Sequence, residues 1–171
     1  MLNLSEPIQW HAETKGEETA TVFGDRKISY GGLNLSINQY CENLKKVDVK
    51  PGDIVGIDLG DTPEHVILLF ALTRMSAVIL PLDVKWTVAE KLSVTEHFSA
   101  KLVVTDNPTQ PFRVSISVSQ LEAANQNTSY ELSGESGLAV PFLISLSSGT
   151  TGRPKGPLIN QEHFFRRFVT H

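Results

Sequence analysis

Apolar residues recur at steps of three and four along the segment that follows Ser29, which is a helical pattern. They fall on one face of a helix, and Ser29 is a candidate for its N-cap. A coiled coil is the alternative interpretation, but the segment is too short for the several heptads that a coiled coil needs. We therefore expect the apolar face to dock on a core, with Cys41 beside it as a small buried hydrophobe rather than a nucleophile. The apolar face consists of Tyr30, Leu33, Ile37, Tyr40, Leu44 and Val47.

Strand-like and helix-like segments alternate after this helix. A turn signal at 50–53 precedes the first strand, and Thr62 and Thr87 are placed to cap the two helices. The almost wholly apolar run at 77–82 is typical of a buried parallel strand. This order predicts right-handed βαβ units, and hence an α/β fold with a mostly parallel sheet and flanking helices. The expected strands are 53–59, 77–82 and 101–105, and the expected helices are 62–75 and 87–98.

The two ends of the chain carry further elements. Asn160 is a candidate cap for a last helix, which has apolar positions at Phe164, Phe165 and Phe168. The sequence stops at His171 inside this pattern, without a helix stop signal, which predicts a fragment of a longer protein. The other expected elements are a helix over 5–15, a hairpin of 19–23 with 27–29, a strand over 113–118, a loop over 124–136, and strands over 138–146 and 157–159.

Composition and charge exclude several classes of protein. The chain has 171 residues, 15 of them basic and 19 acidic, which fits one ordinary domain and disfavours nucleic acid as a partner. A single cysteine cannot form an internal disulfide. The apolar stretch 66–82 is interrupted by Arg74, and the N-terminus lacks a signal-peptide pattern, so we expect no transmembrane segment and a cytoplasmic location. No ligand spacing links the histidines, and solvated or structural roles are expected for His11, His65, His97, His163 and His171.

The end of the chain departs from this acidic balance. Residues 137–171 hold Arg153, Lys155, Arg166 and Arg167, with Glu162 as the only acid. A locally positive segment in an acidic chain predicts an anion site there.

The segment SSGTTGRPKG, residues 147–156, supplies the groups that such a site needs. Glycines reach positive φ at low cost, so that successive backbone N–H groups can point into one concavity. The hydroxyls add donors, and Lys155 adds a compact positive charge. We therefore interpret the segment as a cradle for a polyphosphate. The candidate phosphate-binding residues are Ser147, Ser148, Gly149, Thr150, Thr151, Gly152, Lys155 and Gly156.

Other interpretations of this segment fit less well. A flexible connector has a similar composition, but it rarely combines so many hydroxyls with a Pro-Lys-Gly stop and flanking buried strands. A Walker-type loop needs a second glycine and then a hydroxyl after the lysine, but here Pro154 and Gly156 occupy these positions. A Rossmann fingerprint also fails, because the spacing around Gly56 and Gly60 is wrong.

The segment resembles the phosphate loop of the adenylate-forming (AMP-binding) superfamily, which includes acyl-CoA synthetases, peptide-synthetase adenylation domains and luciferases. The signature of that loop is usually written S/T-S-G-S/T-T-G-x-P-K-G. Three upstream segments resemble the same family in order and spacing: ISYGGL at 28–33, VKPGDIV at 49–55 and AVILPLD at 77–83. The chain departs from the family pattern at Ser76, Pro157 and Gln161, which blurs any assignment to a subfamily.

The resemblance implies a ligase that activates a carboxylic acid with Mg-ATP and passes the acyl group to a thiol of coenzyme A or a carrier phosphopantetheine. It implies that Ser148, Thr150 and Thr151 bind phosphate oxygens and that Lys155 neutralises charge, with Mg²⁺ held through ATP rather than by the protein directly. The loop glycines would shape the backbone, and Arg153 is expected to be solvated at the loop mouth.

Much of that family's machinery follows the phosphate loop and has no match in residues 157–171. We therefore expect residues 1–171 to be part of an AMP-binding N-terminal domain that is inactive alone, with an α/β subdomain at 1–136 and the strand, loop and truncated helix at 137–171. The alternative is a free-standing, non-catalytic nucleotide-binding or docking module. In either case the exposed truncated surface could form a dimer.

Overall fold

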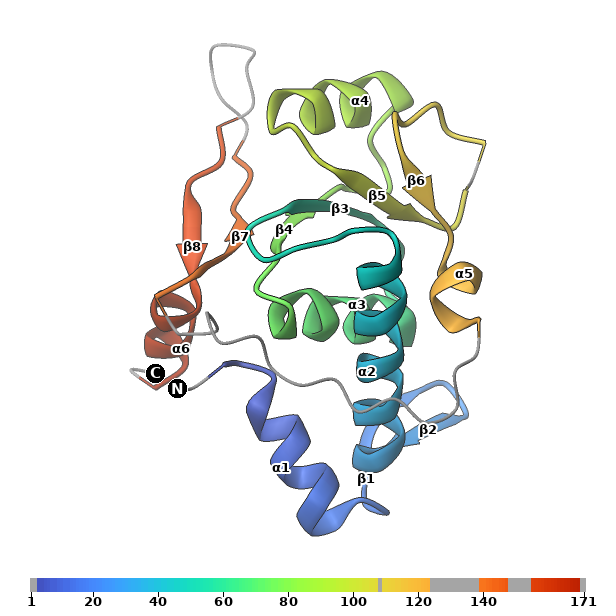
Figure 1. The fold of residues 1–171 in the computed structure, drawn as a ribbon, viewed down its shortest axis with the longest axis vertical. Coiled ribbons are helices and arrows are strands. Elements are labelled where there is room, and N and C mark those ends of the chain that lie inside the picture. Colours follow the sequence, from blue (N-terminus) through green and yellow to red (C-terminus); the bar gives the residue numbers. More distant parts are fainter. Residues whose placement is uncertain (1–2, 108, 124–138, 148–154, 170–171) are drawn as a thin grey trace.

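Figure 1 shows the computed structural model as a sheet with helices on both of its faces. The structure describes residues 3–107, 109–123, 139–147 and 155–169, and in the last helix the side chains as far as Arg166. The elements are α1 (Glu6–Lys15), β1 (Thr19–Phe23), β2 (Arg26–Ser29), α2 (Tyr30–Lys46), β3 (Ile54–Asp58), α3 (Pro63–Arg74), β4 (Val78–Pro81), α4 (Val88–His97), β5 (Leu102–Thr105), β6 (Ser115–Ile116), α5 (Val118–Glu122), β7 (Pro141–Ile144), β8 (Leu158–Asn160) and α6 (Gln161–Val169).

The large sheet has the strand order β6-β5-β3-β4-β7-β8, and β1 and β2 form a separate antiparallel hairpin. Neighbouring strands of the large sheet are parallel except for β7 and β8, which are antiparallel. β3 lies at the centre, with Val55 opposite Ile79 on β4 and Leu102 on β5. The predicted α/β fold with a mostly parallel sheet is therefore confirmed.

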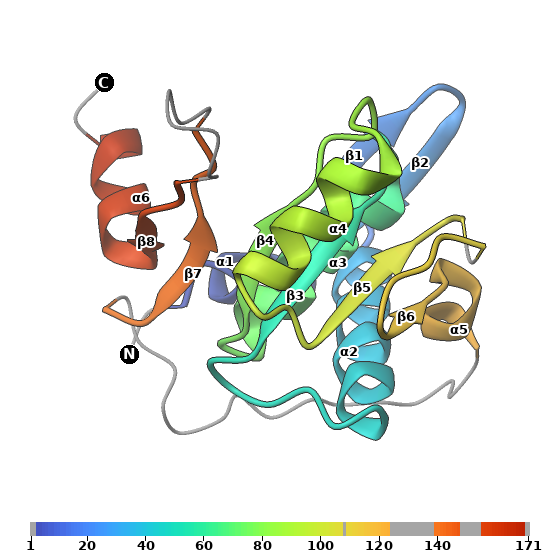
Figure 2. The ribbon, with the colours of Figure 1, turned by 90° about the horizontal axis from the view of Figure 1, so that it is seen from above.

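The helices divide unequally between the two faces of this sheet. α2 and α3 pack on one face, while α4 lies across the other (Figures 1 and 2). The larger buried cluster lies on the α2–α3 side and includes Ile37, Leu44 and Leu68. A smaller cluster beneath α4 joins Val94 to side chains of β4, β5 and β7.

The local signals for helix starts are confirmed. The Ser29 side chain accepts a hydrogen bond from the Gly32 N–H, as expected for the cap of α2. Thr62 and Thr87 cap α3 and α4 in the same way, and Thr87 forms a full capping box with Glu90. These caps satisfy backbone donors that a helix leaves unpaired in its first turn.

The predicted apolar face of α2 is buried except at its ends. Leu33, Ile37, Tyr40 and Leu44 are buried, whereas Val47 is 41% exposed, so the prediction was wrong for Val47. The reason is that α2 ends before this residue, which serves as its C-cap and so leaves the helical face.

The expectation for Cys41 is confirmed, because its side chain is fully buried. Its thiol lies 3.5 Å from the carbonyl oxygen of Ala71, on the facing helix α3. Burial raises the pKa of the Cys41 thiol to about 12, which leaves almost none of the reactive thiolate at neutral pH.

The segment predicted as one strand over 113–118 contains two elements. Ser115 and Ile116 form β6, and the chain then turns into the short helix α5. A capping box joins Ser117 and Gln120, whose side chains each accept the other's backbone N–H. The prediction was wrong for the second half because this cap overrides the alternating pattern.

The C-terminal elements follow the expected order. β7 lies within the expected strand over 138–146 and is shorter, whereas β8 has the expected length but begins and ends one residue later than the expected 157–159. The predicted loop at 124–136 lies outside the described residues. Asn160 caps α6 as predicted, since its side chain accepts the His163 N–H at 2.8 Å. Phe164 packs edge-on against Phe142 of β7, whereas Phe165 is 45% exposed. The side chain of Phe168 lies outside the described residues.

Arg74, which interrupts the apolar stretch in the sequence, is 1% exposed. Its guanidinium donates to the side-chain oxygen of Asn38 on α2 and to both the hydroxyl and the carbonyl oxygen of Ser5 before α1. One cation therefore joins three helices on the same face of the sheet. Buried charges are tolerated where hydrogen bonds satisfy them, as here.

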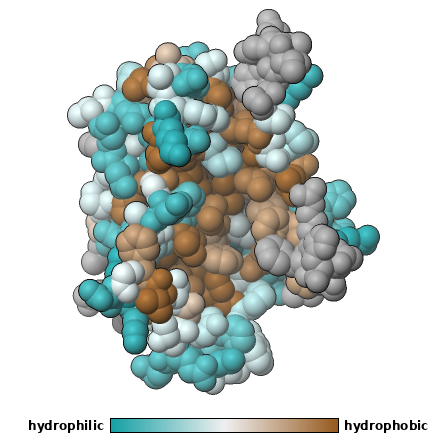
Figure 3. Space-filling view, turned by 180° about the vertical axis from the view of Figure 1, so that it is seen from behind, coloured by the Kyte–Doolittle hydropathy of each residue, from teal (hydrophilic) through white to brown (hydrophobic). Residues whose placement is uncertain are grey.

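The face opposite to that of Figure 1 carries a broad apolar area near its centre (Figure 3). Contiguous apolar areas of this kind are typical of surfaces that other protein covers. In the described part of the chain, no helix is both long enough and apolar enough to cross a bilayer.

Candidate functional site

The predicted phosphate loop is the connection between β7 and β8, and its two ends are held together. Beyond β7, the N–H of Ser145 donates to the carbonyl oxygen of Pro157 at 3.1 Å. The N–H of Ser147 then donates to the carbonyl oxygen of Lys155 at 2.9 Å, which forms a further antiparallel bridge. The two ends of the loop are therefore fixed side by side. The predicted site residues Ser148, Gly149, Thr150, Thr151 and Gly152 lie between them, outside the described residues.

The loop follows the carboxyl end of a parallel strand. Leu143 of β7 pairs with Ile79 of β4, so β7 runs in the same direction as the central strands. In open α/β sheets, ligands bind beyond the carboxyl ends of the strands, where backbone groups and loops converge. The position of the loop in the fold thus agrees with a binding role.

The two ends of the loop differ in what they offer to a ligand. The hydroxyl of Ser147 is occupied by a 3.4 Å hydrogen bond to the carbonyl oxygen of Lys155. The Lys155 side chain is exposed, and in the described parts of the chain it has no ion-pair partner. A lysine at the loop edge without a competing carboxylate nearby is suited to an anionic ligand.

Gly156 lies in close contact with two side chains. A Cβ atom added to it would lie 2.4 Å from Cγ2 of Ile144 and 2.8 Å from Cζ of Phe98. Real Cβ atoms do not approach other heavy atoms so closely, because van der Waals repulsion rises steeply there. Position 156 therefore requires glycine because a larger residue has no space there. The sequence alone did not indicate this steric requirement.

A buried ion pair at the carboxyl ends of β3 and β5 was missed in the sequence. The Lys91 ammonium on α4 donates to Oδ1 of Asp58 at 2.6 Å, and the hydroxyl of Thr105 donates to Oδ2 at 3.0 Å. The side chains of Lys91 and Asp58 are 5% and 3% exposed. The carbonyl oxygen of Val84 accepts a further, longer contact from Lys91 at 3.5 Å. This cluster fastens α4 to the sheet.

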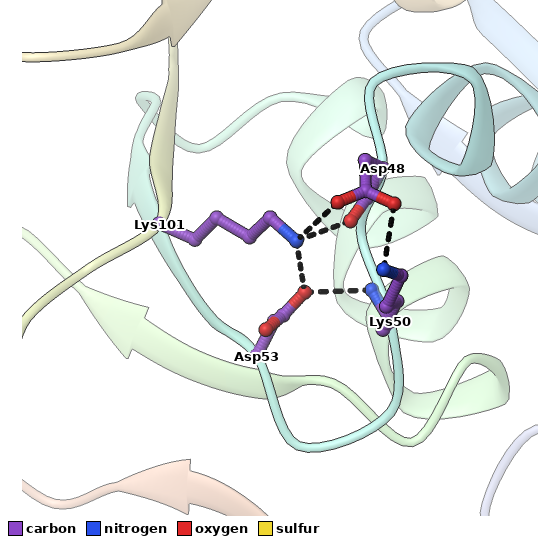
Figure 4. A network of polar contacts seen from close by, with 4 residues as sticks. All are labelled: Asp48, Lys50, Asp53 and Lys101. Atoms are coloured by element: carbon purple, nitrogen blue, oxygen red, sulfur yellow. Dashed lines mark hydrogen bonds and ion pairs between the residues drawn. The ribbon is translucent and has the colours of Figure 1, made fainter.

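A second charged cluster lies at the amino ends of the same strands (Figure 4). Lys101 contacts Asp53 at 2.7 Å and Asp48 at 3.2 Å, and Lys50 contacts Asp48 at 3.0 Å. Hydrogen bonds from Lys50 and Lys101 lower the pKa of Asp48. The hydrogen bond to Asp53 in turn raises the pKa of Lys101. These pairs are mostly exposed and satisfy one another, so they offer no free charge to a ligand.

The histidines form no site in the described structure. The Nδ1 atom of His65 lies 3.1 Å from the carbonyl oxygen of Gly60, and the ring of His11 packs at a tilt against the rings of Trp10 and Tyr30. Among the residues that the structure describes, no group of three His, Cys, Asp or Glu side chains is placed to hold a metal ion.

Comparison with known proteins decides the family. The family model described as "AMP-binding enzyme" matches residues 8–171, which is nearly the whole chain. The chain belongs to the AMP-binding enzyme family. The predicted resemblance to adenylate-forming enzymes is therefore confirmed.

Curated proteins that are similar along most of this chain are much longer than it is. Malpibaldin synthetase of Mortierella alpina is 29% identical in an alignment 164 residues long, which covers 91% of this chain and 3% of that protein. Tyrocidine synthase 1 of Brevibacillus parabrevis is 26% identical, with coverage of 94% and 15%. Crotonobetaine/carnitine–CoA ligase of Salmonella paratyphi A is 25% identical, with coverage of 92% and 36%. The chain thus spans well under half the length of these relatives.

Solved structures of AMP-binding proteins share the fold. The N-terminal subdomain of NpsA from Klebsiella oxytoca, in complex with 3-hydroxybenzoyl-AMSN, matches with a TM-score of 0.84 at 24% identity. This match covers 94% of the present chain and 41% of that subdomain. O-succinylbenzoate coenzyme A synthetase (MenE) from Bacillus subtilis, in complex with AMP, matches with a TM-score of 0.82 at 22% identity. The present chain therefore has the fold of a part of each of these structures.

Proposed function

We propose that this chain is the N-terminal part of an ATP-dependent acid–thiol ligase. In the proposed reaction, a carboxylate attacks the α-phosphorus of Mg-ATP, which forms an acyl-adenylate and releases pyrophosphate. The thiol of coenzyme A or of a carrier phosphopantetheine then attacks the acyl carbonyl, and AMP leaves. Membership of the AMP-binding family supports this reaction class, and the similar proteins include one named as a CoA ligase and others named as synthetases or synthases.

The observation that carries the proposal is the placement of the loop. Its ends, Ser147 and Lys155, are joined by a hydrogen bond at the carboxyl end of a parallel strand. We assign Lys155 to neutralise charge that builds on the departing pyrophosphate, and we assign Ser148, Thr150 and Thr151 to phosphate oxygens. In this proposal the loop also aligns the phosphates with the attacking carboxylate, which reduces the entropy cost of the reaction.

The proposal treats residues 1–136 as an α/β subdomain and 137–171 as the part that carries the loop, within a larger AMP-binding domain. The apolar area in Figure 3 supports contact with further protein, because large apolar areas are usually covered. The predicted dimer gains no support from the described structure, and the cytoplasmic location stays a prediction. We propose that residues 1–171 alone do not turn over substrate.

ATP–pyrophosphate exchange tests the proposal. The full natural protein that contains residues 1–171 would be assayed with amino acids, aryl acids and fatty acids as substrates. We expect Lys155→Ala to lower exchange by roughly 10²-fold, as for removal of one charged stabilising group, and Lys155→Arg to lose less. Lys27→Ala is the matched control, because Lys27 is an exposed lysine on the β1–β2 hairpin.

The outcomes separate the two functions that the sequence left open. Unchanged exchange in Lys155→Ala, with the fold intact by circular dichroism, would reject the role assigned to Lys155. ATP binding by calorimetry without exchange on any acid would favour a non-catalytic nucleotide-binding module. Absence of both ATP binding and exchange would reject the proposed function.

A further inference from the structure

We propose that Phe98 is a positioning residue for the phosphate loop. Its ring, together with the side chain of Ile144, fixes the backbone of Gly156 and so sets the place where the chain leaves the loop. This inference rests on the proposed function of the loop. The contact of Phe98 and Ile144 with Gly156 is a structural observation and holds whatever that function is.

Three elements meet at this contact. Phe98 lies at the C-terminal end of α4, Ile144 ends β7, and Gly156 is the last residue of the loop segment, just before β8. Figures 1 and 2 both show this end of α4 beside the β7–β8 hairpin. A Cβ atom at Gly156 would lie only 2.8 Å and 3.2 Å from two ring carbons of Phe98, so the glycine backbone rests directly against the ring.

Phe98 is half-buried, and both its backbone and its ring have contacts. The Phe98 N–H donates to the carbonyl oxygen of Val94 at 3.1 Å, and the ring packs against the buried cluster beneath α4. Further along α4, the ion pair of Lys91 with Asp58 ties the helix to β3. Because α4 is attached to the sheet, the contact with Phe98 determines where the backbone at the end of the loop lies.

The backbone ladder that joins the hairpin to the rest of the sheet is short. β7 pairs with β4 at one register position, Ile79–Leu143, whereas β3 and β4 are in register from Ile54–Val78 to Ile57–Pro81. β8 is an edge strand that pairs only with β7 in the described structure. Loss of the Phe98 ring should therefore loosen the hairpin near the loop while the rest of the fold stays intact. Lys155 is adjacent to Gly156, so its ammonium would shift with the backbone.

Hydrogen exchange and kinetics on the same variants test this inference. In the full natural protein, we expect Phe98→Ala to speed amide exchange in peptides that contain Ser145 and Ser147, whose N–H groups bond across the hairpin. We also expect a rise in KM for ATP of about tenfold, with KM for the acid little changed, because misplacement by about 1 Å costs up to 10²-fold. Phe98→Leu should restore most of both properties.

Phe112→Ala is the matched control. Phe112 is a buried aromatic residue of the same cluster, but its ring is not among the nearest neighbours of a Cβ at Gly156. A general structural effect would change both variants alike. Equal effects of Phe98→Ala and Phe112→Ala, or wild-type exchange and KM in Phe98→Ala, would overturn the inference.

A second pair of variants tests the same contact by substitution of a glycine instead of Phe98. Gly156→Ala should speed hairpin exchange and weaken ATP binding, since its methyl group has no space. Gly60→Ala is the control, because a Cβ there meets nothing within 4 Å. If wild-type protein shows no ATP-dependent activity but Phe98→Ala and Gly156→Ala still loosen the hairpin, the proposed function fails and the contact stands. If ATP-dependent activity is present and neither variant alters it, the inference fails alone.

Discussion

β3 and β5 carry a charged cluster at each end, and the two clusters differ in their exposure to water. At the carboxyl ends, Lys91 and Asp58 are 2.6 Å apart and almost fully buried. At the amino ends, Lys101 and Asp53 are 2.7 Å apart but 31% and 27% exposed. The distances between the charged atoms are nearly equal, so distance alone cannot rank the two pairs.

The comparison shows that burial decides the cost of breaking an ion pair. Water screens the charges of an exposed pair and solvates whichever partner is left after a substitution. A buried charge left without its partner is neither screened nor solvated by water, so removal of one member of a buried pair costs about 3–5 kcal/mol. The buried pair should therefore contribute more to stability than the exposed pair does. It also fixes α4, whose C-cap residue Phe98 contacts the end of the loop.

The largest expected effect comes from Lys91→Met. This change leaves the buried Asp58 carboxylate without its cation, and we expect a loss of about 3–5 kcal/mol in the free energy of unfolding. Urea denaturation followed by circular dichroism measures the loss. Lys101→Met at the exposed end is the matched control. A similar loss in both variants would contradict the comparison.

A smaller effect is expected from Thr105→Val. The substitution removes the hydroxyl that donates to Oδ2 of Asp58 at 3.0 Å, while the shape of the side chain is nearly kept. A buried acceptor that loses one partner costs about 1–3 kcal/mol, so the loss should be smaller than for Lys91→Met. The same denaturation measurement ranks the two variants, and a reversed order would show that Thr105 rather than Lys91 dominates the cluster.

Lys101→Met should cost less than either change in the buried cluster, and its effect should depend on salt. Its partners Asp48 and Asp53 reach water, so added salt screens the pairs in the wild type. We expect the difference between variant and wild type in the urea midpoint to shrink between about 0.1 M and 1 M NaCl. A difference that does not change with salt would indicate a packing role for the aliphatic part of Lys101.

The smallest effect concerns acid. The pKa of Asp48 is lowered in the folded protein, so its ionised form stabilises the fold above the ordinary aspartate pKa of about 3.9. This contribution is lost as the pH falls below that value and through the lowered pKa. Asp48→Asn should therefore flatten the fall of the urea midpoint between about pH 5 and pH 3. Asparagine tolerates the positive φ of 64° at this position, so backbone strain does not confuse the result. An unchanged pH profile would show that the network contributes nothing measurable.

The sequence by itself determined the order of the elements and the nature of the loop. Periodicity of apolar residues and capping side chains are short-range signals, and they located α2, α3 and α4 with the parallel strands between them. The motif at 147–156 identified the family that the later comparison confirmed. Even the missed helix α5 had a local signal, the capping box of Ser117 and Gln120.

Only the tertiary structure decided which distant residues meet. Lys91 and Asp58 are 33 positions apart, and nothing in the pattern around either one indicates the other. The same holds for Gly156 against Phe98, and for Arg74 against Asn38 and Ser5. Such contacts arise when helices pack across a twisted sheet, because the packing sets which side chains lose water together. Local sequence patterns are formed by neighbours along the chain, so they determine the elements but leave these contacts open.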